Sequence, residues 1–211
     1  MMIKISRITS ILVLILILIL IGTTIYNYFR TSAIVESYHA RGIVEYKFNQ
    51  LPAEYQDILI KVQDPGFYSH KGVDFNTPGA GWTTITQSLS KFFYFEDFKP
   101  GWRKIPQTIY ARFALHPKVA KENQLDLFIN IIGFGNGTRG ILSASQFYFN
   151  SKPDELTKDE YISLIAILNN PKMLNPMDNP DANSERARRI KKYINGEYVP
   201  KNVFDNEYED A

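Results

Sequence analysis

Residues 63–74, QDPGFYSHKGVD, decide the fold of this chain. A Pro-Gly pair directly follows Gln63 and Asp64, and Pro-Gly breaks a helix. Upstream, apolar residues recur at helical spacing between Tyr55 and Val62, and Pro52 suits a helix start. The stretch therefore predicts a helix that ends at the polar pair. Two further short motifs follow, GWTTITQ at residues 81–87 and RKIPQ at residues 103–107.

The rest of the chain also shows helical periodicity, which predicts a mainly α domain with few strands. Asp181 or Asn183 is expected to cap the last helix. Residues 30–50 are expected to form an extended segment that leads into the domain. Residues 196–211 read as a polar tail that is frayed from Asn202 onward. Helices are expected at residues 84–94, 104–115, 122–132, 141–149, 157–168 and 183–194, with a glycine-rich loop at 133–140.

The composition excludes several classes of protein. The 211 residues suffice for one domain and an anchor, and 45% hydrophobic with 14% aromatic residues excludes a disordered chain. A net charge of +2 is too small to indicate nucleic-acid binding. The absence of cysteine excludes disulfides, thiol catalysis and thiolate metal sites. The histidines, His39, His70 and His116, lack the spacing of a zinc site.

One apolar run near the N-terminus predicts a membrane anchor at residues 8–29, after a cytoplasmic segment at residues 1–7. About 20 residues, at about 1.5 Å each, cross a hydrocarbon layer roughly 30 Å thick. Lys4 and Arg7 precede the run, which orients the N-terminus to the cytoplasm and the domain to the outside. A cleaved signal peptide is the alternative, but the run is longer than usual and has no clear small-x-small cleavage site.

Five motifs in this order behind one anchor resemble the peptidoglycan glycosyltransferases, the family 51 transglycosylases. The first three motifs are those quoted above. The resemblance implies a lysozyme-like, two-lobed domain at residues 51–195. Such a domain polymerises lipid II, a lipid-linked disaccharide-peptide, at the outer face of the bacterial inner membrane. Because the chain ends soon after the fifth motif, it resembles the monofunctional class. The fourth motif comprises residues 124–130, 133–140 and 143–149, and the fifth comprises residues 156–160, 165–171 and 175–176.

Two departures from the family concern its chemistry. The resemblance places the family's two catalytic glutamates at Gln63 and Gln107. The reaction needs a base that takes a proton from the attacking sugar hydroxyl. An amide keeps the shape and hydrogen bonds of a carboxylate, but it accepts no proton and carries no charge. General-base catalysis contributes about 10²–10⁴-fold, so its loss should raise the barrier by about 3–5 kcal/mol while the saccharide site keeps its shape.

Another acid is the alternative source of a base. Asp64 is adjacent to Gln63, but an ion pair or a helix-end contact is its simpler role. Glu96 and Asp97 lie in an aromatic connector, residues 92–102, which could swing toward the site. The connector itself suits either the lipid interface or the core. The basic last helix, which carries Arg186, suits either anionic lipid or solvent.

The resemblance also implies positions that contact the substrate. Cations at such positions suit the lipid diphosphate, and a solvated basic patch is the alternative. For His70 the alternative is a structural hydrogen bond. Trp82 replaces a family glycine, and it either stacks on a sugar or fills the space left by the short 71–82 segment. No metal site is expected, although a divalent cation at the diphosphate remains open. The implied positions are His70, Thr84, Gln87, Lys91, Arg103 and Lys104.

We therefore expect a single-pass protein of the bacterial inner membrane whose domain lies on the periplasmic or extracytoplasmic side. Its expected partners are lipid II or nascent glycan and membrane lipid, but no nucleic acid, and its turnover is expected to be weak. This interpretation requires Gln63 and Gln107 to lie at one groove. One alternative is a non-catalytic scaffold or regulator that binds glycan or a cell-wall synthase. Another is an active transglycosylase with a relocated base.

Overall fold

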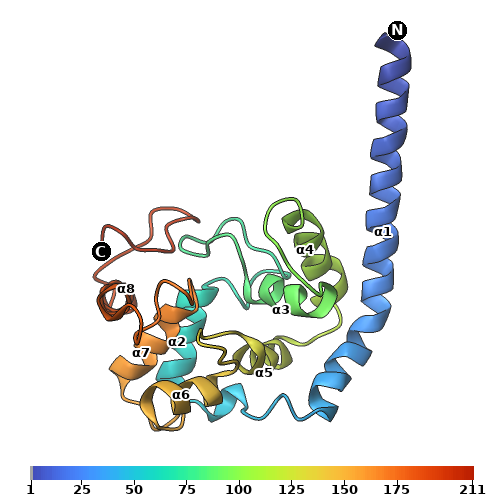
Figure 1. The fold of residues 1–211 in the computed structure, drawn as a ribbon. Coiled ribbons are helices and arrows are strands. Elements are labelled where there is room, and N and C mark those ends of the chain that lie inside the picture. Colours follow the sequence, from blue (N-terminus) through green and yellow to red (C-terminus); the bar gives the residue numbers. More distant parts are fainter. Residues whose placement is uncertain (1) are drawn as a thin grey trace.

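The computed structural model describes residues 2–211, with side chains from Arg7 onward. The described chain is mainly α, as predicted, and its only β pairing is a single bridge between Gly133 and Arg139. Figure 1 shows one long helix beside a domain of short helices. The elements are α1 (Met2–Ala40), η1 (Phe48–Gln50), α2 (Ala53–Gln63), α3 (Ile85–Tyr94), α4 (Lys104–Tyr110), η2 (Ala111–Leu115), α5 (Lys121–Ile131), α6 (Ile141–Phe149), α7 (Lys158–Ile167) and α8 (Pro180–Ile194).

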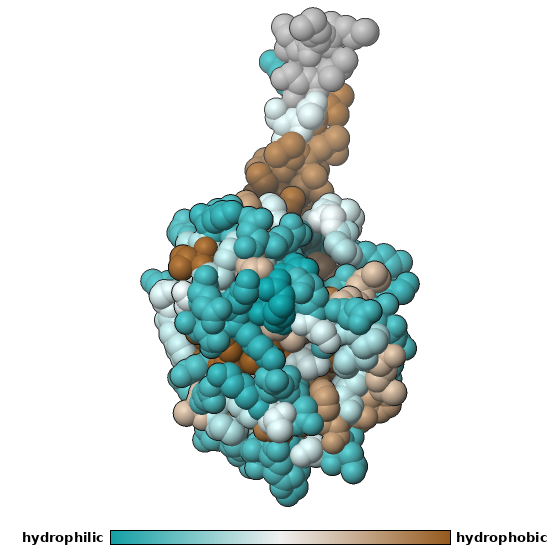
Figure 2. All heavy atoms as spheres, turned by 90° about the vertical axis from the view of Figure 1, so that its left-hand side faces the viewer, coloured by the Kyte–Doolittle hydropathy of each residue, from teal (hydrophilic) through white to brown (hydrophobic). Residues whose placement is uncertain are grey.

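The helix α1 carries the apolar run, and residues Arg7–Ala40 are long and apolar enough to cross a membrane. Its apolar side chains from Ile8 to Ile21 project into the surroundings, above a largely hydrophilic domain surface (Figure 2). This suits a membrane anchor, and an N-terminal signal sequence has the same character. The domain lies beside the C-terminal part of this helix (Figure 1), where η2, α4 and α3 contact it.

The extended segment predicted at residues 30–50 is wrong over its first part, because α1 continues to Ala40. Tertiary contacts hold this extension. Thr31 is fully buried, and its hydroxyl lies 2.7 Å from the Tyr94 hydroxyl of α3. Arg30 donates to the Phe93 carbonyl at 3.1 Å. The helix ends where Gly42 takes a left-handed conformation, with φ of 66°.

The short helices form two groups with α5 between them. One group contains α2, α7 and α8, with α6 packed on α7. The other contains α3, α4 and η2, and it packs on α1. Because α5 contacts both α3 and α6, it joins the groups into one core, in which Phe67, Leu127 and Tyr161 are fully buried. The predicted helix at residues 104–115 is present as α4 and η2, with Pro106 in its first turn as expected.

The last helix begins earlier than predicted, at Pro180, where proline is tolerated in the first turn. Neither Asp181 nor Asn183 caps it. The Asn183 side chain instead lies inside the fold and donates to the carbonyls of Ser163 and Leu174, at 3.0 and 2.8 Å. A tertiary role thus replaces the expected capping role.

The prediction of a frayed tail is also wrong. Residues 200–211, which we call the C-terminal segment, pack on the domain. Tyr208 is fully buried, and its ring lies 4.5 Å from that of Tyr193. Arg186 of α8 donates to the carbonyls of Asn206 and Glu207, both at 2.7 Å. A segment of polar composition is therefore held by one buried aromatic ring and one buried cation.

Candidate functional site

A cavity of about 280 Å³ lies between the two helix groups, at the end of α2. Both groups and the C-terminal segment contribute to its walls, so it is a cleft of the whole domain. Its polar lining comes from Gln63, Trp82, Thr83, Ser88, Lys91, Asn169, Arg186 and Asn206, and its apolar lining from Val62, Ala80, Phe128, Ile132 and Leu168.

The cleft is positively charged. Lys91 and Arg186 line it, and none of the described lining residues is Asp or Glu. Burial lowers the pKa of the Lys91 ammonium. Lys104 lies behind Thr83 and donates to its hydroxyl at 2.5 Å. Burial and the charge of Lys91 lower the pKa of Lys104 to about 8. Two crowded ammonium groups without an acidic partner favour an anion, which would relieve their repulsion.

Gln63 is the last residue of α2, and it is half-buried at the cleft. Its amide makes no hydrogen bond with any described residue, so both its donor and its acceptor are available to a ligand. An amide can hydrogen-bond a sugar hydroxyl, but it cannot accept the proton at neutral pH. The sequence predicted this placement, because the helix was expected to end at Gln63-Asp64.

Gln107 is placed differently. It is fully buried and is not among the residues that line the cleft. Its amide nitrogen donates to the carbonyl of Gln87 at 2.7 Å, and its side-chain oxygen has no partner. Gln107 therefore joins α4 to α3, the helix that supplies Lys91 to the cleft. The expectation that both glutamines lie at one groove is therefore wrong, and only Gln63 bears on the chemistry of the cleft.

Asp64 and His70 form a buried structural pair. The Nε2–H of His70 donates to both carboxylate oxygens of Asp64, at 2.9 and 3.0 Å. The other ring nitrogen, Nδ1, accepts from the backbone of Gly72 at 3.0 Å, which fixes the neutral tautomer. Asp64 also accepts from the backbone N–H of Ile85 at 2.9 Å, at the start of α3. Both side chains are committed to the fold, and neither lines the cleft.

Thr84 and Gln87 form a capping box at the start of α3. The Thr84 hydroxyl accepts from the backbone of Gln87 at 3.1 Å, and the Gln87 side chain accepts from the backbone of Thr84 at 3.0 Å. The Gln87 amide nitrogen donates to Thr108 at 2.9 Å. These contacts orient α3 and hence Lys91. The structure therefore places Thr84 and Gln87 behind the cleft.

Arg103, Glu96 and Asp97 lie elsewhere, in an open depression of about 780 Å³ beside Arg30 of α1. Arg103 donates to the Asp97 carbonyl, and the Asp97 carboxylate pairs with Lys99 at 3.3 Å. The connector is divided between core and surface, because Phe93 is buried whereas Trp102 is exposed. None of these acids borders the cleft that contains Gln63.

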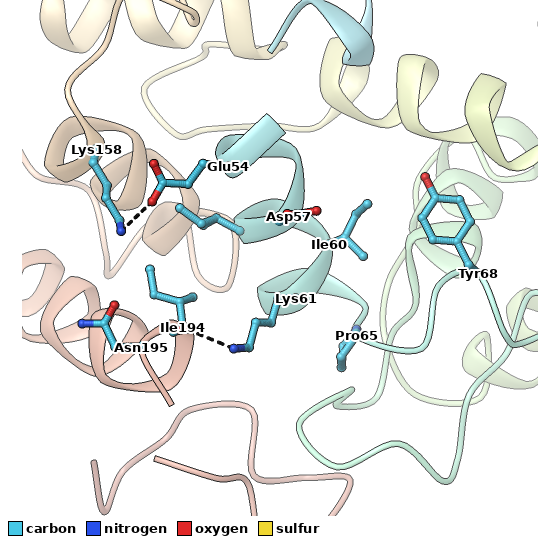
Figure 3. A pocket seen from close by; sticks show the side chains of 10 residues that line it. Glu54, Asp57, Ile60, Lys61, Pro65, Tyr68, Lys158, Ile194 and Asn195 are labelled. Atoms are coloured by element: carbon cyan, nitrogen blue, oxygen red, sulfur yellow. Dashed lines mark hydrogen bonds and ion pairs between the residues drawn. The ribbon is translucent and has the colours of Figure 1, made fainter. Parts of the chain in front are cut away.

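Another open depression, of about 750 Å³, lies on another side of α2 (Figure 3). It contains Glu54 and Asp57, but Glu54 pairs with Lys158 at 2.7 Å. Lys61 points to α8 and donates to the Ile194 carbonyl at 3.1 Å. The predicted site residues do not line this depression, so its carboxylates do not replace those missing from the cleft.

Sequence reasoning missed Arg186, Asn169 and Asn206 as cleft residues. One signal for Arg186 was available, because it shares a helical stripe with the buried Ile190 and Tyr193. An arginine within such a stripe is buried and paired rather than solvated. Asn206 had no comparable signal, since its position depends on how the C-terminal segment folds back.

A family model described as Transglycosylase matches residues 30–195, and the chain therefore belongs to this family. Penicillin-binding protein 4 of Bacillus subtilis (strain 168) is 33% identical over 76% of the chain, and penicillin-binding protein 1F of the same organism is 33% identical over 67%. Penicillin-binding protein 1A of Neisseria cinerea is 32% identical over 70%. The match covers 27%, 22% and 20% of these relatives' own lengths, so the chain spans about a fifth to a quarter of each.

The cleft does not suit a divalent cation. Within the described part of the chain, no group of three or more His, Cys, Asp or Glu residues is placed to hold a metal ion. The donors at the cleft are neutral amides and hydroxyls beside ammonium and guanidinium groups. Mg²⁺ and Ca²⁺ prefer carboxylate oxygens. The cations of the chain itself are therefore the groups available to an anionic ligand.

Proposed function

We propose that this chain binds lipid II or nascent glycan at the outer face of the bacterial inner membrane, and that its glycan polymerisation is impaired. One observation carries the proposal. A positively charged cleft lies at the end of α2, Gln63 lines it at the position where the resemblance implies the family's base, and none of the described lining residues carries a carboxylate.

The cleft suits this ligand chemically. A lipid-linked sugar combines a negatively charged diphosphate with a hydroxyl-rich saccharide. Lys91 lines the cleft and offers a charge-assisted hydrogen bond to the diphosphate, and Lys104 adds positive charge behind Thr83. Gln63 offers a neutral amide to the sugar hydroxyls. The cleft thus keeps groups that can bind the ligand, but it lacks a carboxylate that could accept the proton of the attacking hydroxyl.

A relocated base is the weaker alternative. Asp64 already accepts three hydrogen bonds and is fully buried. Glu96 lies in the depression beside α1 and not in the cleft. A chain that binds glycan without polymerising it is suited to a scaffold or regulator of a cell-wall synthase, and this role follows from the same observation. The apolar α1 supports a single membrane crossing, with the domain outside the cytoplasm.

A binding measurement tests the proposal. The full-length chain in lipid nanodiscs is titrated with lipid II, and Lys91→Ala is compared with the exposed control Lys99→Ala. We expect saturable binding that Lys91→Ala weakens by about ten- to hundredfold, because a hydrogen bond to a charged group contributes about 1.5–3 kcal/mol. Lys99→Ala should leave it unchanged. Absence of lipid II binding by the unmodified chain would refute the proposal.

A further inference from the structure

The turn at residues 79–82 and the C-terminal segment are joined along their backbones. The N–H of Gly79 donates to the Asn202 carbonyl at 3.0 Å, and the N–H of Gly81 donates to the Val203 carbonyl at 2.7 Å. Gly81 has φ of 68°, and a Cβ there would lie 2.9 Å from the Asn206 side-chain nitrogen. The Asn206 side chain therefore packs directly over Gly81, whose positive φ also favours glycine.

This junction forms one edge of the cleft. Trp82 and Asn206 both line the cavity, as does Arg186, which anchors the C-terminal segment. Arg186 is 3% exposed, and its Nε–H has no hydrogen-bond partner. The Asn206 amide makes no hydrogen bond with any described residue. This edge of the cleft thus carries hydrogen-bond donors and one acceptor that have no partner within the described chain, namely the Arg186 Nε–H and the Asn206 amide.

The same edge presents a flat aromatic surface. The rings of Trp82 and Phe204 stack with centroids 4.3 Å apart and 23° between their planes. Stacking holds the indole in place, yet Trp82 is still 65% exposed. Trp82 therefore does not fill a buried space, which was one of its two expected roles. A fixed and exposed ring beside free amides matches a pyranose, whose C–H face packs on a ring while its hydroxyls bond to amides.

We propose that Trp82, Asn206 and Arg186 form a saccharide subsite at the edge of the cleft, built by the C-terminal segment. The inference rests on the proposed glycan-binding function and assigns the residues that contact the sugar. Trp82 provides the stacking surface, Phe204 holds the indole, and Asn206 bonds to a ring hydroxyl. Arg186 lines the cavity and holds the C-terminal segment in place.

The chain offers a direct optical test, because it has two tryptophans, Trp82 and Trp102. In a Trp102→Phe background, all tryptophan emission comes from Trp82. The full-length chain in detergent is titrated with a lipid-free tetrasaccharide of alternating N-acetylglucosamine and N-acetylmuramic acid. We expect a saturable change in emission. Calorimetry should show that Trp82→Ala and Asn206→Ala weaken binding by about five- to tenfold each, as expected for residues at the centre of a binding site.

Two controls make the test decisive. Phe75→Ala removes another exposed phenylalanine, which is 64% exposed, and it should leave affinity unchanged. Phe204→Ala could release the C-terminal segment, so Trp82→Ala and Trp82→Phe carry the test, and Trp82→Phe should retain most of the affinity. Tetrasaccharide binding that is insensitive to both Trp82→Ala and Asn206→Ala would overturn the subsite while leaving the proposed function intact.

The remaining outcomes are equally informative. If the unmodified chain binds neither the tetrasaccharide nor lipid II, the proposed function itself fails. If Trp82 emission is quenched by brominated lipid vesicles and is insensitive to the tetrasaccharide, this edge contacts the membrane, and the saccharide subsite is overturned.

Discussion

His70 donates from Nε2 to the carboxylate of Asp64, 2.9 Å away and fully buried. The pair fixes the chain after α2 to the start of α3, since Asp64 also accepts from the backbone of Ile85. Asp64, the acid nearest in sequence to Gln63, is therefore a structural residue, and its removal should destabilise the domain.

Asp64→Ala should destabilise the domain by about 3 kcal/mol or more, because it leaves the His70 and Ile85 N–H groups buried without acceptors. The matched change Asp57→Ala removes an exposed carboxylate of α2 and should alter the free energy of unfolding by about 0.5 kcal/mol or less. Urea denaturation measures both. A stable Asp64→Ala protein would show that the pair has no structural role.

Gln107→Glu should also destabilise the domain, by about 1–3 kcal/mol, because it puts a carboxylate at a fully buried position. The loss should be larger at pH 8 than at pH 5, since a buried carboxyl is most unfavourable when ionised. Gln63→Glu, at a half-buried position, is the control and should change stability by about 0.5 kcal/mol or less. Equal melting temperatures for the two variants at pH 8 would contradict this expectation.

Lipid II affinity should fall as the pH rises from 7 to 9. The pKa of Lys104 is lowered to about 8, so the ammonium is mostly protonated below that pH and mostly neutral above it. The loss should be about tenfold at most, the change in the protonated fraction over this range. The diphosphate diester stays ionised throughout. Burial also lowers the pKa of Lys91, which acts in the same direction.

Lys104→Arg tests the source of that pH dependence, because a guanidinium stays charged over the whole range. The variant should bind lipid II with a flatter pH profile. If its profile matched that of the unmodified chain, Lys104 would not be the titrating group.

Arg186→Lys should loosen the C-terminal segment, because an ammonium cannot reproduce the paired bonds to the Asn206 and Glu207 carbonyls. The readout is amide hydrogen exchange at Gly79 and Gly81, whose N–H groups donate to that segment. Exchange there should accelerate by about tenfold, for a loss of about 1.4 kcal/mol. Arg139→Lys is the control. Unchanged protection would mean that Arg186 does not anchor the segment.

Local sequence patterns predicted most of the helices, because apolar spacing and caps act within a few residues. The helix from Thr84 to Tyr94 is an example, with its capping box at the predicted start. The same patterns placed Gln63 at a helix end, where it lines the cleft. Lys91 lines the same cleft, and its contact with substrate stays a prediction.

The remaining features depend on contacts distant in sequence. Helix α1 continues beyond residue 30, where an extended segment was predicted, because Thr31 is buried against Tyr94. No local sequence pattern encodes that contact. The C-terminal segment folds because Arg186 and Tyr208 are buried together, although its composition is polar and acidic. Gln107 faces α3 rather than the cleft, a choice of helix face that the motif alone did not determine.

Polymerisation of lipid II by the purified full-length chain tests the central claim most directly. Gel analysis of glycan strands compares the unmodified chain with Gln63→Glu and with Gln63→Glu/Gln107→Glu. We predict little or no polymer from the unmodified chain, and a rate increase of about 10²–10⁴-fold when a carboxylate returns at position 63. Long strands made by the unmodified chain, at a rate that neither substitution increases, would contradict the account.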